Sequence, residues 1–284
     1  MTGYSGISTH LIAAVIFCLS SIGALASDDA STRKFDFQFG GDVSKDTQDL
    51  ITQATSDISQ FYSSELGVSI PSRTKVFASG DPKFLAKHNV AQKKIPGHYK
   101  QAVKDWTNLR ENEAIYGAIF IRTNSNSFNM DVGSGIKNQR MRVMVHELFH
   151  IVQYSLVGSR ARNCCPSDRV PMIGPTWLVE GSSQYLMYYF EQERGISNLS
   201  GWKNHAGGLR KSFKGSLSSF ETRRGMDSNK DSYELAALAV HMLVSKAGMP
   251  ALKLFWQELG NGQKWQTAFK TAFGTTSTEF YATY

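Results

Sequence analysis

Two histidines and a glutamate form the pattern HExxH, with His146 and His150 four residues apart and Glu147 beside the first. Apolar side chains recur at helical spacing through residues 138–157, which predicts a helix there. Residues four apart on a helix project from the same side, so both imidazoles can reach one Zn²⁺ ion at about 2.0–2.1 Å. Glu147 can then accept a proton from a water at that ion. The pattern predicts a metal centre that activates water.

A catalytic zinc site needs a third protein ligand and one open position. One extended motif would place glycine at 153 and histidine at 156, but the chain has Gln153 and Leu156. The next candidate is Glu180, 30 residues after His150 on a second predicted helix. Gly181 and the two serines after it would let that helix pack closely beside the metal.

Two structural alternatives stay open at this point. The two histidines can simply pack on a helix surface. Glu180 can simply be a polar residue in an early helical turn, where its negative charge interacts favourably with the positive end of the helix dipole. Against both, His146 and Glu147 interrupt an otherwise apolar helix. Polar groups buried there without a partner would cost several kcal/mol. A bound metal supplies that partner, so the metal interpretation is favoured.

The two motifs together resemble those of the gluzincins, zinc metallopeptidases related to thermolysin and to aminopeptidases. The resemblance rests on HELFH at residues 146–150 and PTWLVEGSSQY at residues 175–185. Weaker likeness continues at residues 233–243 and 269–274, and in all it covers residues 47–284. Only the two metal motifs are specific.

The resemblance implies one Zn²⁺ per chain, with His146, His150 and Glu180 as ligands and Glu147 as general base. It also implies that Tyr233 stabilises the oxyanion of a tetrahedral intermediate, because a phenol can donate a hydrogen bond to that charge. A tyrosine that only packs at a helix start is the alternative. His241 is the rival candidate for the same role, although it falls inside an apolar helix.

The resemblance further implies a substrate-binding edge strand ahead of the active-site helix. The natural candidate is residues 116–121, from Tyr116 to Ile121, within a strand predicted at 114–122. A protein or peptide substrate would pair its backbone with this edge. Because no exopeptidase motif precedes it, endopeptidase action is favoured over trimming of free N-termini.

The elements around these motifs predict an α+β, zincin-like fold. A mixed α/β lobe with an edge strand spans residues 27–137, and the central HExxH helix with a mainly helical C-terminal lobe spans residues 138–284. The two make one catalytic domain, residues 27–284. Helices are expected at 46–66, 138–157, 175–194, 231–246, 250–259 and 265–273, strands at 68–70, 74–78 and 114–122, and irregular segments at 83–104, 163–174 and 198–230.

The first 26 residues predict a signal peptide. They carry no charged side chain, contain the apolar run LIAAVIFCL and end in Ala24-Leu25-Ala26, a small-x-small cleavage pattern before Ser27. We expect a protein that is secreted or periplasmic, and an uncleaved anchor is the alternative. No later segment approaches the roughly 20 apolar residues of a membrane span.

Removal of the signal would leave Cys164 and Cys165 as the cysteines of the mature chain. Because these two cysteines are adjacent, no disulfide between them can close a long loop within one chain. In an oxidising compartment they allow a vicinal disulfide or an intermolecular one.

The net charge of +7 favours anionic partners, but no nucleic-acid-binding motif accompanies it. The leading hypothesis is therefore an exported zinc-dependent peptidase. The alternatives are an inactive binding or adhesion module on the same scaffold, which would not need Glu147, and a zinc hydrolase of a non-peptide bond. The sequence does not predict the substrate or the oligomeric state.

Overall fold

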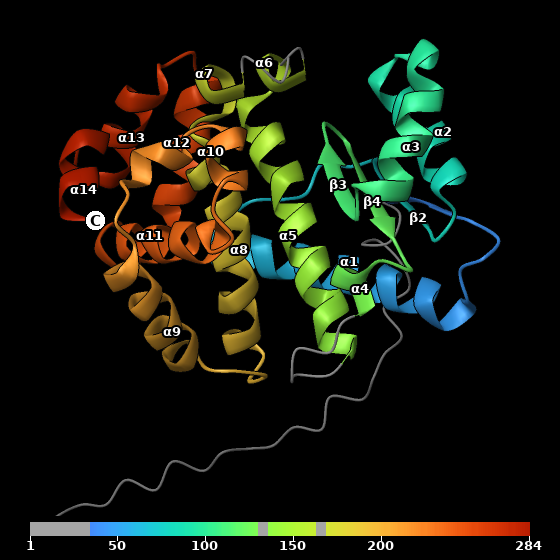
Figure 1. The fold of residues 1–284 in the computed structure, drawn as a ribbon, viewed down its shortest axis with the longest axis horizontal. Coiled ribbons are helices and arrows are strands. Elements are labelled where there is room, and N and C mark those ends of the chain that lie inside the picture. The colour runs from blue at the N-terminus through green and yellow to red at the C-terminus, as the bar shows by residue number, and fades with distance from the viewer. Residues whose placement is uncertain (1–34, 130–135, 163–168) are drawn as a thin grey trace, which may run out of the picture. The chain divides into compact units, whose positions relative to one another are not determined.

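A four-stranded mixed sheet lies in the N-terminal half of the chain. The structure is a computed structural model that describes residues 35–129, 136–162 and 169–284. The strand order is β1-β2-β4-β3, where β1 is Phe35–Phe39, β2 is Thr74–Ser79, β3 is Asn112–Ile115 and β4 is Ala118–Arg122. β1, β2 and β4 run parallel, and β3 runs antiparallel to β4 (Figure 1). The expected signal peptide and the cysteine pair lie outside the described residues.

The two faces of the sheet pack against different helices because successive side chains of a strand point to opposite faces. Val76 and Ile119 belong to the main hydrophobic core, which α1 (Lys45–Leu66) and α5 (Ile136–Val157) share. Phe77 and Phe120 stack on the other face at 4.9 Å between ring centroids. There they meet the helices α2 (Pro82–Lys93) and α3 (Tyr99–Asn108) in a second, smaller core.

The single strand expected at residues 114–122 is two strands joined by a tight turn. Gly117 turns the chain with φ of 76°, a left-handed value that favours glycine. β4 consequently has a strand on each side of it, β2 and β3. The expectation that residues 116–121 form the substrate-binding edge was therefore wrong. The outer strand next to β4 is β3.

The expected long helices are present. α1 and α5 match their predicted ranges within two residues, and so does α8 (Thr176–Glu193). In the C-terminal half follow α11 (Ser232–Ala247), α12 (Pro250–Gly260), α13 (Trp265–Phe273) and α14 (Ser277–Thr283). A fold with mixed α and β structure is thus confirmed, with a small sheet early in the chain and mainly helices after it.

Three segments expected to be irregular contain helices. Residues 83–104 form α2, the 3₁₀ turn η2 (Pro96–His98) and most of α3. Residues 198–230 form α9 (Leu199–Ser212), η4 (Leu217–Phe220) and α10 (Arg223–Asp227), and α7 (Arg169–Ile173) lies within 163–174. Asp81 caps α2 and Asn198 caps α9, because their side chains accept hydrogen bonds from the first backbone N–H groups. The expected strand at residues 68–70 is absent and is coil.

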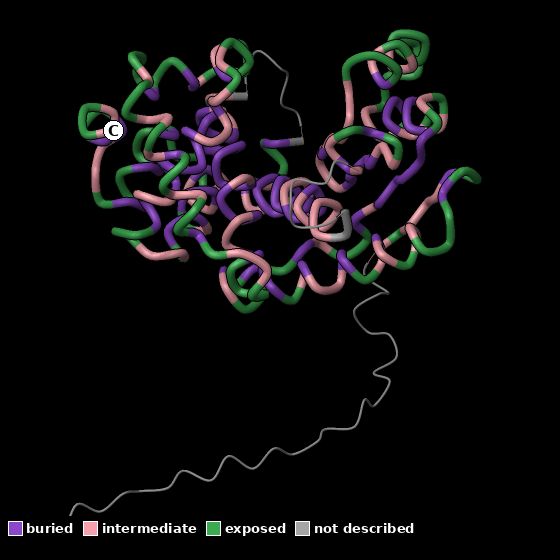
Figure 2. Tube along the Cα trace, turned by 60° about the horizontal axis from the view of Figure 1, so that its bottom comes forward, coloured by how far each residue is buried: buried purple, intermediate pink, exposed green. Residues whose placement is uncertain are grey.

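The helix α5 lies in the interior, where Figure 2 shows the buried stretches gathered. The hydroxyl of Tyr62 on α1 donates a hydrogen bond to the backbone carbonyl of Val145, one residue before His146. α8 and α11 approach so closely at Gly181 that a Cβ there would lie 2.6 Å from the backbone of Ala236. Gly181 therefore permits close helix packing beside Glu180, as expected.

No single helix in the described ranges is long and apolar enough to cross a membrane. α11 and α12 pass that test only as a pair, with a bend of 101° between them. The described residues, 35–129, 136–162 and 169–284, belong to one compact unit.

Candidate metal centre

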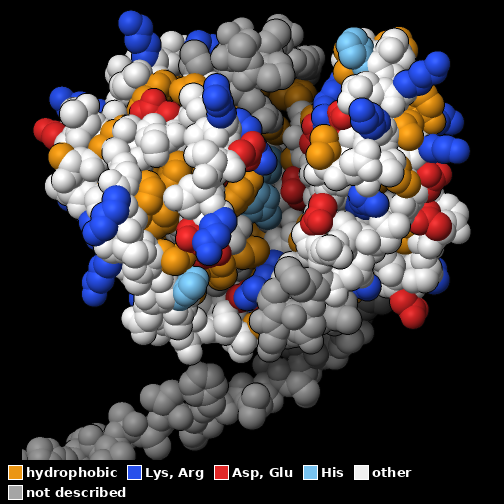
Figure 3. All heavy atoms as spheres, viewed as in Figure 1, with side chains coloured by type: hydrophobic (Ala, Val, Ile, Leu, Met, Phe, Trp, Pro, Cys, Tyr) orange, Lys and Arg blue, Asp and Glu red, His pale blue; other side chains and the backbone are white. Residues whose placement is uncertain are grey.

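A pocket of about 360 Å³ opens between the β3 edge and the C-terminal helices. Figure 3 shows histidine side chains in this hollow, with acidic and basic side chains around it. Its walls contain five of the six residues that the sequence singled out for metal binding and catalysis, all but His241. The five are His146, Glu147, His150, Glu180 and Tyr233.

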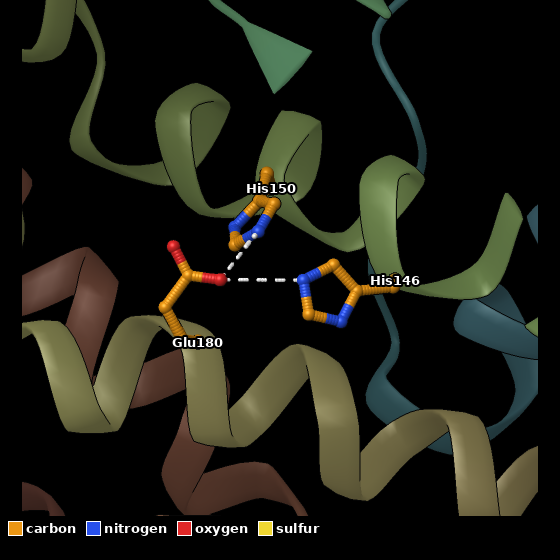
Figure 4. A group of neighbouring side chains, drawn as sticks. All are labelled: His146, His150 and Glu180. Carbon is orange, nitrogen blue, oxygen red and sulfur yellow. Dashed lines mark hydrogen bonds and ion pairs between the residues drawn. The ribbon is translucent and has the colours of Figure 1, made fainter. Parts of the chain in front are cut away.

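Three of these residues bring their ligand atoms to one point. His146 and His150 project from α5, and Glu180 faces them from α8 (Figure 4). The Oε2 atom of Glu180 lies 3.3 Å from Nε2 of His146 and 3.5 Å from Nε2 of His150. All three ligand atoms lie within 4.8 Å of one another, so the group can hold a metal ion.

The two spacings between Glu180 and the histidines fit a tetrahedral ion. Two ligand atoms at the usual zinc distances would lie about 3.3–3.6 Å apart, which follows from the tetrahedral angle. Both oxygen–nitrogen distances at Glu180 fall in that range. His150 and Glu180 are buried, with only 6% and 8% of their surfaces exposed. Bulk water therefore cannot satisfy these polar groups, and they need another partner. The residues present therefore fit a bound metal.

The buried side chain of Gln153 fixes the tautomer of His150. Its Nε2 atom donates to the backbone carbonyl of Val179 at 2.9 Å. Because a carbonyl can only accept, the amide oxygen of Gln153 must face His150, and it lies 2.8 Å from Nδ1. Neutral His150 consequently carries its hydrogen on Nδ1 and offers the lone pair of Nε2 to the metal position.

The charges of the site act on one another. Burial alone would raise the pKa of Glu180, but the charge of His150 and the hydrogen bonds of both histidines bring that pKa well below its usual value. Burial alone would lower the pKa of His150, yet the Glu180 carboxylate raises it. Glu180 is therefore ionised near neutral pH, as a metal ligand must be.

Glu147 differs from Glu180 in its environment. Burial raises the pKa of Glu147, and the neighbouring histidines oppose that rise only in part. A carboxylate with a raised pKa is a stronger base near neutral pH. Glu147 on α5 and Glu180 on α8 thus have pKa values shifted in opposite directions, a feature of acid–base sites.

Arg223 on α10 contacts the other oxygen of Glu180. Its Nη1 atom donates to Oε1 at 3.2 Å, and its Nε atom lies 2.9 Å from Asp227. Oε1 is engaged by the guanidinium while Oε2 faces the histidines. The contact favours a Glu180 carboxylate that offers one oxygen to a metal.

Tyr233 lies in the first turn of α11, with its ring 6.2 Å from that of His146. The adjacent Glu234 holds this turn in place. Glu234 accepts hydrogen bonds of 2.6 Å from both Tyr188 and Trp202. Burial first, and the charge of Glu180 second, raise the pKa of Tyr233, so its hydroxyl remains a donor.

His241, the rival of Tyr233, lies elsewhere. Its ring packs 5.6 Å from Tyr185 and 6.0 Å from Trp202, and it does not line the pocket. Other residues of the pocket wall were not singled out from the sequence, and they are Arg110, Asn112, Glu113, Ala114, Tyr154 and Arg223. Of these, Arg223 follows a recognisable helix cap, Thr222, but nothing in its local sequence indicates a contact with Glu180.

Neither a protein-family model nor a curated protein matches the chain. The functional interpretation therefore depends on the residues and geometry of the pocket itself.

Proposed function

We propose that the protein is a zinc-dependent metallopeptidase of the gluzincin type, with a zincin-like fold. One observation carries the proposal. Three candidate ligands, a carboxylate with a raised pKa and a phenol donor line a single pocket. A site that only bound a structural metal would need the ligands but neither Glu147 nor Tyr233.

In the proposed reaction, His146, His150 and Glu180 hold the ion. Zinc, when bound, polarises a carbonyl group and makes a water molecule more acidic. Glu147 accepts the proton of the attacking water and passes it to the amine that leaves. Tyr233 donates a hydrogen bond to the carbonyl oxygen as negative charge develops on it.

The outer strand β3 is the proposed docking edge for the substrate. Asn112, Glu113 and Ala114 of this strand line the pocket, and among the described strands β3 pairs with β4 alone. An extended peptide can add itself to such an edge by backbone hydrogen bonds. This supports a peptide substrate, and the lack of an exopeptidase motif in the sequence favours endopeptidase action. The apolar N-terminal run supports activity outside the cytoplasm.

Two variants separate the metal ligand from the base. His150→Ala should lose bound zinc and hydrolysis together, because one ligand is removed. Glu147→Gln should keep about one zinc per chain but lose most hydrolysis, since an amide cannot accept the proton. Elemental analysis and cleavage of a broad peptide library, with and without a chelator, measure both quantities. Full zinc content in His150→Ala, or undiminished hydrolysis in Glu147→Gln, would contradict the proposal.

A further inference from the structure

The helices α2 and α3 carry most of the net charge of the chain. Residues 82–108, which span the two helices and the turn between them, contain six lysines and one acidic residue, Asp105. Their net charge of +5 compares with +7 for all 284 residues. Figure 1 shows α2 and α3 side by side, and Figure 3 shows basic and apolar side chains together at that end.

Most of these lysines have no acidic partner within the structure. Lys93 forms an ion pair with Glu113 at 2.7 Å. None of the other five has an ion pair among the residues described, and all five are exposed. They are Lys83, Lys87, Lys94, Lys100 and Lys104. Their charge is available to an anionic partner.

The tip of this helical hairpin, residues 94–100, adds apolar side chains to the charge. Every residue of the tip is exposed. Ile95 and Tyr99 are 37% and 38% exposed, which makes them two of the four exposed large hydrophobic residues in the described chain. Pro96 lies between them, and Lys94 and Lys100 flank them.

We propose that this tip docks the protein on a membrane surface that carries anionic lipid head groups. The charge complementarity argues for an anionic surface, since each lysine close to such a surface contributes favourably to binding. The apolar side chains select a bilayer over a soluble polyanion. Ile95 and Pro96 can enter the boundary between head groups and acyl chains, and a tyrosine ring is suited to that boundary.

Docking through the tip would also bring the pocket near that surface. Glu113 on the outer strand β3 accepts hydrogen bonds of 2.7 Å from Asn89 and from Lys93, both on α2. The hairpin is thereby fixed to one wall of the pocket. The membrane proposal itself does not depend on what the pocket does.

Vesicle binding tests the proposal directly. The purified chain is titrated with phosphatidylcholine vesicles that contain or lack phosphatidylserine, and bound protein is measured by sedimentation. We expect binding only to the anionic vesicles, and loss of binding as salt rises from about 0.05 M to about 0.5 M. Equal binding to both vesicles, or to neither, would overturn the proposal.

Paired variants assign the binding to the tip. Lys94→Gln with Lys100→Gln should weaken binding about 10–30-fold. The double variant Ile95→Ser with Tyr99→Ser should bind anionic vesicles about 10-fold more weakly. Binding of the same variant to heparin, a soluble polyanion, should stay unchanged. Every variant carries the same N-terminal segment, so differences between variants belong to the substituted positions.

Matched controls use side chains elsewhere on the surface. Lys214→Gln with Lys264→Gln removes the same charge, and Leu254→Ser removes an apolar side chain that is 37% exposed. Both should bind anionic vesicles like the unchanged protein, and thermal unfolding should show all variants folded. Tip variants that bind as well as these controls would overturn the proposal. So would an apolar tip variant that loses only heparin binding.

Discussion

Arg223 on α10 donates a hydrogen bond to Oε1 of Glu180, the carboxylate oxygen that does not face the histidines. HExxH places its residues on one helix face by a fixed period, so His146 and His150 could be assigned from the sequence. Glu180 could be inferred from its motif. Arg223 reaches Glu180 across 43 residues of chain, through the packing of α10 beside α8, and no period encodes that distance.

Replacement of Arg223 by glutamine should weaken metal binding by about 10-fold, in the range found when a partner of a metal ligand is removed. Without the guanidinium on Oε1, the carboxylate of Glu180 can rotate away from the histidines. A competition titration with a chelating dye measures the affinity. Arg224→Gln on the same helix removes an exposed charge and is the control. Tighter binding in Arg223→Gln would show that repulsion between the guanidinium and the ion matters more than orientation.

Removal of the Tyr233 hydroxyl tests its proposed role. Tyr233→Phe should lower kcat by roughly 10²–10³, the usual effect of losing one oxyanion donor. Metal content should not change because no ligand is lost, and KM should change little because the bond matters mainly in the transition state. If the Tyr233 ring only packs at the start of α11, the kcat of Tyr233→Phe should be close to that of the unchanged protein. His241→Ala, outside the pocket, is the comparison.

At the scale of elements, the close contact of α8 with α11 determines where Glu180 and Tyr233 lie relative to each other. Both helices were expected from the sequence, at 175–194 and 231–246, and both lie within one residue of those bounds. The turn at Gly117 was not predicted, because a single glycine between two β-favouring segments was interpreted as part of one longer strand. The lysine-rich helices α2 and α3 were missed although Tyr99, Ala102, Val103 and Trp106 follow a helical spacing, because the many lysines and the Pro96-Gly97 turn suggested an irregular segment.

Gly181→Ala should destabilise the protein by about 1–3 kcal/mol, because the added methyl group meets backbone atoms that cannot move independently. The added Cβ would lie 2.6 Å from the carbonyl carbon and oxygen of Ala236. Thermal unfolding measures the loss. In the exposed helix α9, Gly201 has no atom within 4 Å of an added Cβ, so Gly201→Ala should be neutral or stabilising. Equal unfolding temperatures for the two variants would contradict the packing argument.

At the scale of the whole molecule, the metal should link two parts of the fold that are distant in sequence. α5 and α8 each contribute ligands, and the long helix α5 also packs on the sheet. Sequence reasoning predicted an α+β protein. It did not predict the strand order β1-β2-β4-β3, because strand order depends on contacts between distant segments rather than on local pattern.

Metal removal should lower the unfolding temperature of the protein. An ion present at 1,000 times its Kd stabilises the folded state by about 4 kcal/mol, which corresponds to roughly 8–16 °C for a chain of this size. Calorimetry with and without a chelator measures the shift. Glu147→Gln should keep the shift because it keeps all three ligands, whereas Glu180→Gln should lose most of it. An unchanged unfolding temperature on chelation of the unaltered protein would contradict metal binding at this site.

The hydrogen bonds of Gln153 have a consequence for which ion the site accepts. This one side chain joins His150 to the carbonyl of Val179, the residue before Glu180, so two ligands on different helices are held at a set separation. A cage with a set separation cannot widen around a larger ion such as Ca²⁺ or Mn²⁺ without breaking one of those bonds. The metal-free protein would therefore already select ions by their radius, because the hydrogen bonds of Gln153 fix the separation of the ligands on α5 and α8.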